Sequence, residues 1–317
     1  MAAGSKKVVI AALIGNALIA VTKFFAAAMT GSSAMFSEAI HSVVDTGNQG
    51  LLLYGMRRAD RPADAAHPFG YGKELDFWAF VVAMMLFALG SGISLYEGVH
   101  KVLNPHPLQN VGWNYAVLGL AFCFEAVALS IALKEFNAVR GRIPWLRAIR
   151  QSKDPALFTV VFEDSAALMG LTAAFIGVFC ADVFGIVWAD GAASIVIGII
   201  LGLAAVTLAI ETKGLLIGEA ADDHLVEDII GVAGKAHFVD AVNEARTIHF
   251  GPMDVLVNLS VDARNALSAG EVETGITALE ELIKSRHPEI TRVFIEIQAA
   301  RDSDDPVPDA GDAPLTV

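Results

Sequence analysis

The sequence predicts a membrane all-α bundle of six transmembrane helices followed by a small cytoplasmic α+β domain. The 317-residue chain is 55% hydrophobic, and its mean hydropathy of +0.55 is unusual for a soluble domain. Its apolar residues concentrate before about residue 217, while the remainder has the mixed polarity of a soluble domain. We therefore expect a membrane domain over 1–213, an α+β domain over 214–300 and a disordered acidic tail over 301–317.

The membrane domain is predicted from apolar stretches that each hold the roughly 20 residues a bilayer-spanning helix needs. The six stretches are Val8–Met29, Ala34–Met56, Phe77–Val99, Val111–Leu133, Leu157–Ala181 and Ile186–Ile210. Short turns at Thr30–Ser33 and Asp182–Gly185 join span one to span two and span five to span six. These two pairs should therefore form helical hairpins.

Basic residues predict the orientation of the bundle. They concentrate before span one, between spans two and three, and between spans four and five, whereas the opposite loops offer only Lys101. Because cytoplasmic loops carry the excess of Lys and Arg, both termini should be cytoplasmic, most simply in a cytoplasmic membrane. The net charge of −13 argues against nucleic acid as a partner.

The second domain is predicted from a change of periodicity after Ile210. Helix, strand, strand, helix and strand follow in order, over Asp222–Ala236, Val242–His249, Val255–Val261, Ser268–Arg286 and Val293–Ile297. Ser268 and Glu271 have the spacing of a capping box at the start of the second helix. The order α-β-β-α-β predicts a ferredoxin-like domain with its helices on one face of the sheet.

Span two carries an unusual stripe of polar residues. His41, Asp45 and Asn48 are spaced to share one helix face. A polar stripe can simply hold helices together, but an imidazole beside a carboxylate favours a divalent transition metal or a proton path. Glu38 lies near the outer end of the span, where hydration is the simplest expectation.

Span five carries two adjacent acids, Glu163 and Asp164, which point about 100° apart on a helix. Glu163 shares its face with small residues that let another helix approach, so we favour Glu163 as the acid facing span two. Two roles are left open for Asp164, either as a partner of Glu163 or as the metal ligand in its place. Lys23 in span one is expected to reach the interface or to pair with an acid, and Asp190 to serve as a carboxylate at a helix start.

Two motifs resemble those of the cation diffusion facilitators. One is Ser-Glu-Ala-Ile-His-Ser-Val-Val-Asp over 37–45, and the other is His-Pro-Phe-Gly-Tyr-Gly-Lys-Glu over 67–74. The segments Asp45–Gln49 and Phe162–Ala167 resemble the branch that contains the mitochondrial zinc transporter nine. The likeness covers residues 8–298.

This resemblance implies a homodimer that exports Zn²⁺, its transported substrate, in exchange for protons, with two ligands each from spans two and five. His41 and Asp45 fit the span-two pair. In span five, Glu163 as first ligand puts Ala167 at the second position, so water, Asn48 or Asp164 would complete the set. Two carboxylates and a neutral imidazole would balance one divalent cation.

The resemblance also implies two further metal sites that this sequence weakens. In the loop after span two, Asp64 and His67 are candidate ligands, but Tyr71 stands where a histidine is expected. In the α+β domain, Asn243 and Asn258 stand where histidines are expected.

Other functions remain open at this stage. A glutamate in place of a histidine supplies a harder, oxygen ligand, and such a ligand set could admit Mn²⁺, Fe²⁺ or Co²⁺. Because the set is incomplete, a non-transporting, metal-sensing membrane scaffold is another alternative. An intramembrane metalloenzyme would need a motif such as His-Glu-x-x-His, which the sequence lacks. We therefore expect a secondary transporter and not an enzyme.

Overall fold

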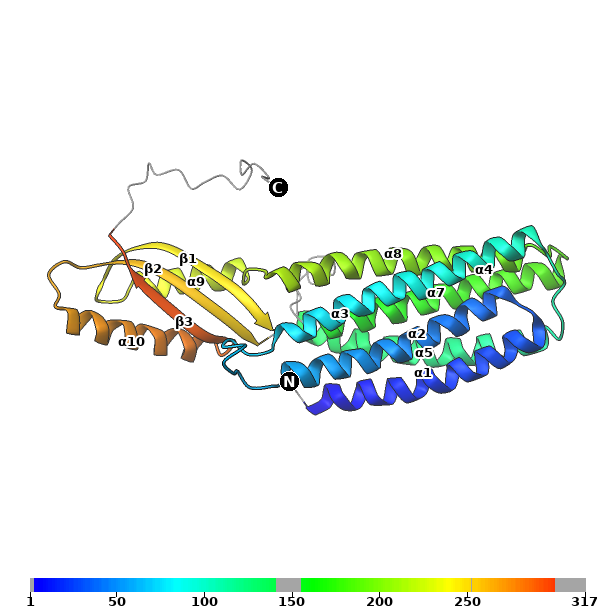
Figure 1. Ribbon diagram of the computed structural model, residues 1–317, viewed down its shortest axis with the longest axis horizontal. Helices are drawn as coiled ribbons and strands as arrows, with labels where there is room; N and C mark the ends of the chain where they lie inside the picture. The colour runs from blue at the N-terminus through cyan, green and yellow to red at the C-terminus, as the bar shows by residue number, and fades with distance from the viewer. Residues whose placement is uncertain (1–2, 141–154, 252, 300–317) are drawn as a thin grey trace. The chain divides into compact units, whose positions relative to one another are not determined.

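The computed structural model describes residues 3–140, 155–251 and 253–299 (Figure 1). They divide into two compact units with the boundary between Ile217 and Gly218. We call these the membrane unit and the α+β unit and describe each by itself. The tail predicted over 301–317 lies outside the described residues.

Long helices build the membrane unit (Figure 1). Each of the six predicted stretches corresponds to helical structure, namely α1 (Ala3–Thr30), α2 (Ser33–Ala59), α3 with η1 and α4 (Lys73–Met85, Leu86–Ser91 and Gly92–Leu103), α5 (Gly112–Arg140), α7 (Pro155–Val183) and α8 (Ala189–Ile217). The third stretch is not a uniform α-helix, because η1 is a π-helical segment in its middle. The apolar pattern alone did not predict that segment.

Four helices in the described part of the chain are long and apolar enough to cross a membrane. They are Lys73–Leu103, Gly112–Ala138, Phe158–Val183 and Ala189–Ile217. The apolar part of α1 within the described side chains is shorter, Gly15–Thr30, and α2 carries the polar stripe. The count of six spans therefore stays a prediction.

Tight glycine turns close the two predicted hairpins. Gly31, between α1 and α2, has a φ of 66°, and Gly185, between α7 and α8, has a φ of 65°. Only glycine adopts this left-handed conformation without a steric cost. The Ser32 side chain then caps α2 by accepting from the Met35 amide.

Asp190 of α8 ties the second hairpin to the start of α2. Its carboxylate accepts hydrogen bonds from the Ser32 hydroxyl and from the Ser33 amide, the latter at 2.7 Å. A carboxylate at a helix N-terminus also favours the helix dipole. Asp190 thus lies in the first turn of α8 as predicted, but the helix whose amide it binds is α2.

Small residues bring α4 and α8 close together. A Cβ placed on Gly98 would lie 2.8 Å from the Gly191 carbonyl oxygen. Close helix packing in membranes relies on such residues. At η1, the Ser91 hydroxyl donates to the Gly198 carbonyl at 2.7 Å, so the π-helical segment is also bound to α8.

The α+β unit has the predicted order α-β-β-α-β. Its elements are α9 (Asp223–Ala233), β1 (Val239–Gly251), β2 (Asp254–Ala263), α10 (Ala269–Arg286) and β3 (Ile290–Ile297). The sheet order is β1-β2-β3, with β1 antiparallel and β3 parallel to the central β2. The capping box between Ser268 and Glu271 forms as predicted at the start of α10.

One face of this sheet forms the core of the unit. Alternate residues of β2, Val255, Val257, Leu259 and Val261, are fully buried and pack in one cluster with Ile229 of α9 and with Leu279 and Ile283 of α10. Burying each such side chain contributes about 1.5–3 kcal/mol. The strand period of two therefore decides which face receives the helices.

Candidate metal site in the membrane unit

His41 and Asp45 lie one turn apart on α2, inside the membrane unit. The His41 side chain is fully buried and Asp45 is 4% exposed. His41 Nδ1 lies 3.3 Å from Asp45 Oδ1. The sequence predicted this pair from its spacing, and the helix forms through it without interruption.

Glu163 of α7 faces α2. The Asn48 side-chain amide donates to Glu163 Oε1 at 2.6 Å, and Glu163 is 3% exposed. A second contact lies further along, where Gly170 of α7 adjoins Glu38 of α2. Because residue 48 meets 163 and residue 38 meets 170, the two helices run antiparallel along this interface.

His41 falls between these two contacts. Glu38, His41, Asp45 and Asn48 share one face of α2, since they follow the helical period. Glu163 and Gly170 are seven residues apart, two turns on one face of α7. The α2–α7 interface therefore encloses the His41 and Asp45 positions.

Asp164 is also buried, at 7% exposed, but the described hydrogen bonds do not connect it to α2. Its Oδ2 has no hydrogen-bond partner among the described residues. The structure thus brings Glu163 to α2, as favoured from the sequence, and leaves Asp164 on the adjacent face. Which of the two binds a cation remains a prediction.

Buried polar atoms without hydrogen-bond partners are concentrated at this interface. Of the ten such atoms found among the described residues, six belong to α2 and two to α7. They include both ring nitrogens of His41, Asp45 Oδ1 and Asn48 Oδ1. An unsatisfied buried polar group costs about 1–3 kcal/mol, so these atoms make the interface the candidate site among the described residues.

The described residues do not yet form a complete metal-binding group. Among them, no three His, Cys, Asp or Glu side chains lie close enough together to hold one metal ion. The pair on α2 and the acid on α7 would have to draw together around a cation. Of the ligand set predicted from the sequence, His41, Asp45 and Glu163 therefore lie at the α2–α7 interface without being gathered at one point, and Asp164 lies on the adjacent face of α7.

Comparison with known proteins identifies the family of this membrane unit. Residues 9–217, well over half of the chain, match the model of the cation efflux transmembrane domain. The chain belongs to the cation diffusion facilitators, the cation efflux family. Together with the four membrane-length helices, this makes it an integral membrane protein.

Three relatives illustrate the range of this family. The mitochondrial proton-coupled zinc antiporter SLC30A9 of Homo sapiens is 30% identical over 261 residues, which cover 82% of this chain and 46% of the relative. Metal tolerance protein C4 of Arabidopsis thaliana is 30% identical over 260 residues, covering 81% and 57%. The manganese efflux system protein MneP of Bacillus subtilis is 24% identical over 304 residues, covering 93% of each chain. This cation diffusion facilitator thus spans about half the length of the first two relatives.

The burial of two ionisable residues of this cation diffusion facilitator was not predicted from the sequence. The expectation that Glu38 is hydrated is wrong, because it is fully buried and paired with Lys23 at 2.9 Å. Glu125 of α5, which sequence reasoning did not single out, is 2% exposed. The available signal was a lone acid in the middle of an otherwise apolar span.

The loop after α2 contains the candidate ligands of the second predicted site, and there the Asp64 carboxylate accepts hydrogen bonds from the loop itself. Asp64 Oδ2 accepts from the Tyr71 hydroxyl at 2.7 Å, and Oδ1 accepts from the amides of Ala66 and His67. These donors, the Tyr71 hydroxyl first and then the His67 amide, hold the pKa of the Asp64 carboxyl below its usual range. Both oxygens thus have donors, which favours a structural role for Tyr71 in fastening the loop.

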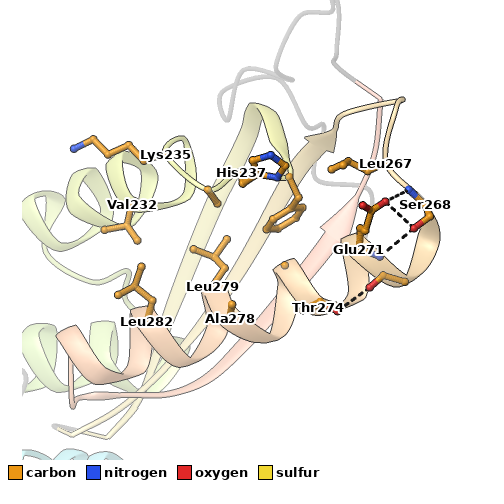
Figure 2. A pocket seen from close by; sticks show the side chains of 14 residues that line it. Val232, Lys235, His237, Leu267, Ser268, Glu271, Thr274, Ala278, Leu279 and Leu282 are labelled. Carbon is orange, nitrogen blue, oxygen red and sulfur yellow. Dashed lines mark hydrogen bonds between the residues drawn. The ribbon is translucent and has the colours of Figure 1, made fainter.

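In the α+β unit, the two asparagines that replace expected histidines lie on the neighbouring strands β1 and β2. Asn243 donates its amide to the Gln298 carbonyl at 3.2 Å, and Asn258 lies on β2. A groove of about 670 Å³ lies between the end of α9 and α10 in this unit. Figure 2 shows that Val232, Leu279 and Leu282 line it with apolar side chains. It contains none of the predicted metal ligands.

Proposed function

We propose that this protein exports a divalent transition metal, zinc first, in exchange for protons, through a site between α2 and α7. The observation that carries the proposal is the α2–α7 interface. Its Asn48–Glu163 bond and Glu38–Gly170 contact enclose His41 and Asp45, where both ring nitrogens of His41 and one oxygen of Asp45 are buried without a hydrogen-bond partner among the described residues. Membership of the cation diffusion facilitators gives this arrangement its reaction class.

The ligands proposed for the transported cation are His41, Asp45 and Glu163. Two carboxylates with a neutral imidazole balance the charge of one divalent ion, and nitrogen and oxygen donors suit Zn²⁺. Asn48 has two roles here, because its amide holds Glu163 while its Oδ1 lacks a partner and offers a fourth donor. Asp164 is the alternative that completes the shell from the adjacent face.

Proton exchange follows from the same atoms. A carboxylate or an imidazole binds metal only in its deprotonated form, so metal and protons compete for one site. The exchange also lowers an electrical cost, since moving one charge across 100 mV takes about 2.3 kcal/mol. A divalent ion leaving a negative interior meets roughly twice that cost, and returning protons offset it.

Manganese is the second candidate substrate, on a specific observation. Glu163 supplies an oxygen where the family pattern has a histidine or aspartate, and oxygen donors favour harder ions such as Mn²⁺. The Bacillus subtilis relative is a manganese efflux protein. Fe²⁺ and Co²⁺ share this argument, and a metal-sensing scaffold without transport is the remaining alternative.

We also propose a homodimer with both termini cytoplasmic. The dimer rests on the family membership, and the orientation on the excess of Lys and Arg in the loops on one side of the predicted spans. In this orientation α2 enters from the outer face at Ser33, and the Glu38–Gly170 contact lies on the outer side of His41.

The test is transport by the full chain in proteoliposomes containing a pH-sensitive dye. We expect Zn²⁺ influx to be accompanied by proton efflux, and both to be lost in His41→Ala and Asp45→Ala. His224→Ala is the matched control, because this histidine is exposed on the α+β unit. Undiminished flux in the two α2 variants would remove the proposed site, and metal uptake without proton movement would remove the exchange. Repeating the assay with Mn²⁺, Fe²⁺ and Co²⁺ ranks the substrates.

A further inference from the structure

A buried ion pair joins α1 to α2 beside the candidate site. Lys23 Nζ donates to Glu38 Oε2 and to the Ser42 hydroxyl, both at 2.9 Å. The Lys23 and Glu38 side chains are both 0% exposed. Removing two charges from water is expensive, and an apolar pair of the same volume often stabilises a fold as well or better. Helix packing alone therefore does not account for this pair.

The pair lies on the same interface as the transport site. Glu38 precedes His41 by three residues and Ser42 follows it directly. Glu38 also adjoins Gly170, which lies two turns from Glu163 on α7. A cation that moves from His41 along this interface towards the α1–α2 turn passes the Glu38 carboxylate.

One oxygen of Glu38 is open on the side of α7. Lys23 engages Oε2, while Oε1 is buried and has no hydrogen-bond partner among the described residues. Gly170 leaves the space for it, because a Cβ at that position would overlap Oε1. The carboxylate thus faces the interface with one oxygen on the ammonium and the other unoccupied.

We propose that Glu38 is a second binding site for the transported divalent cation, and that the Lys23 ammonium occupies it as an internal cation until that ion arrives. The inference rests on the proposed function. The ligands of this second cation site are the Glu38 carboxylate and the Ser42 hydroxyl, oxygen donors that suit a divalent metal ion. When the ion binds, its charge repels the ammonium on the flexible lysine stem, so Lys23 withdraws.

This arrangement explains why a lysine is buried here. A lone carboxylate along the path would hold a divalent ion too tightly, and transport needs sites that an ion can leave again. The ammonium competes for the same oxygens, so it keeps the site weak and neutral when it is empty of metal. Lys23 is therefore a positioning residue for Glu38, while Glu38 touches the substrate.

The experiment measures Zn²⁺ affinity and turnover for the full chain, with single and double substitutions at the pair. Lys23→Met leaves Glu38 without its competitor, so Zn²⁺ affinity should rise and turnover fall, each about tenfold or more. Lys23→Arg, which keeps the charge, should restore most of the turnover. Glu38→Gln should lower turnover without raising affinity.

The double variant Lys23→Met with Glu38→Gln decides between transport and packing. It removes both charges together, so a purely structural pair predicts wild-type affinity and turnover. We expect instead wild-type affinity at the His41 site with turnover reduced about tenfold. Wild-type behaviour of the double variant overturns the inference, and this comparison holds even where Lys23→Met alone does not fold.

Gly170→Ala tests the same site without changing a charge. The added Cβ displaces Glu38 Oε1, and we expect a several-fold loss of turnover; Gly119→Ala is the control because nothing lies within 4 Å of its Cβ. Equal turnover of the two variants contradicts the inference. Failure of the proposed function gives a different result from failure of this inference. In that case His41→Ala transports as well as wild type, or wild type and His41→Ala both fail to transport.

Discussion

The two units of this protein bury opposite kinds of side chain. In the described part of the α+β unit, His249 and Ser260 are the only buried polar residues, and the core is a cluster of aliphatic residues on one sheet face. The membrane unit instead buries Lys23, Glu38, His41 and Asp45 almost completely. The first pattern maximises stability, and the second keeps charge and unpaired polar atoms at one interface at a cost to stability.

This difference indicates where the function resides. The membrane unit can tolerate unsatisfied polar groups only where a ligand or a partner offsets them. The α+β unit has no such requirement among its described residues, and its donors and acceptors are largely satisfied locally. Substitutions in the two units should therefore fail in different ways.

The largest expected effect separates the two neighbouring acids of α7. Glu163→Gln should lower Zn²⁺ affinity by at least about 100-fold, because even partners of metal ligands cost 10–100-fold when removed. Asp164→Asn should stay within about tenfold, since this acid lies on the adjacent face. Isothermal titration with Zn²⁺ measures both, and the reverse ranking would show that Asp164 is the ligand.

Asn48→Ala should have the next largest effect on metal affinity. It removes the amide that holds Glu163 at 2.6 Å and also the unpaired Oδ1. We expect Zn²⁺ affinity to fall about 10–100-fold with the fold intact. Asn104→Ala is the control, because that asparagine is exposed at the end of α4. An unchanged affinity in Asn48→Ala would argue against its part in the site.

A truncation in the α+β core should affect stability but not transport by folded molecules. Leu259 is fully buried on β2, so Leu259→Ala should destabilise this unit by about 2–5 kcal/mol. Denaturant unfolding of the full chain, monitored by hydrogen exchange, measures this loss of stability. Turnover per folded molecule should match wild type, and a parallel loss of turnover in the folded fraction would contradict the division of roles between the units.

The smallest expected effect concerns Asp228 of α9. Its carboxylate binds His287 and Arg286 at the end of α10, each at 2.7 Å, and the His287 hydrogen bond is the main reason that the Asp228 pKa lies below its usual range. A carboxyl group whose pKa is depressed in the folded state stabilises the fold at pH values above the ordinary carboxyl pKa. This contribution is lost as the pH falls through the folded-state pKa.

Asp228→Asn should therefore increase hydrogen exchange in α9 and α10 slightly at neutral pH, and the difference from wild type should vanish in strong acid. Exchange followed by mass spectrometry at several pH values measures it. A difference that grows on acidification would have the wrong sign and would exclude this linkage.

Much of the architecture followed from the sequence because it depends on local periodicity. Runs of about 20 apolar residues predicted the helical stretches, and alternation of residue types predicted β1 and β2. The capping box at Ser268 and the turn at Gly31 follow from side-chain and backbone chemistry within four residues. Likewise the His41–Asp45 pair is a consequence of helical spacing alone.

Only the tertiary structure decided what faces these elements. It placed Glu163 against Asn48, buried Glu38 on Lys23 and made room for it at Gly170. It also introduced the π-helical segment at Leu86–Ser91, which no apolar pattern distinguishes from an α-helix. The period of a helix fixes which residues share a face, but the partner of that face is set by contacts with other helices, whose residues are 115 positions away for Asn48 and Glu163 and 15 for Lys23 and Glu38.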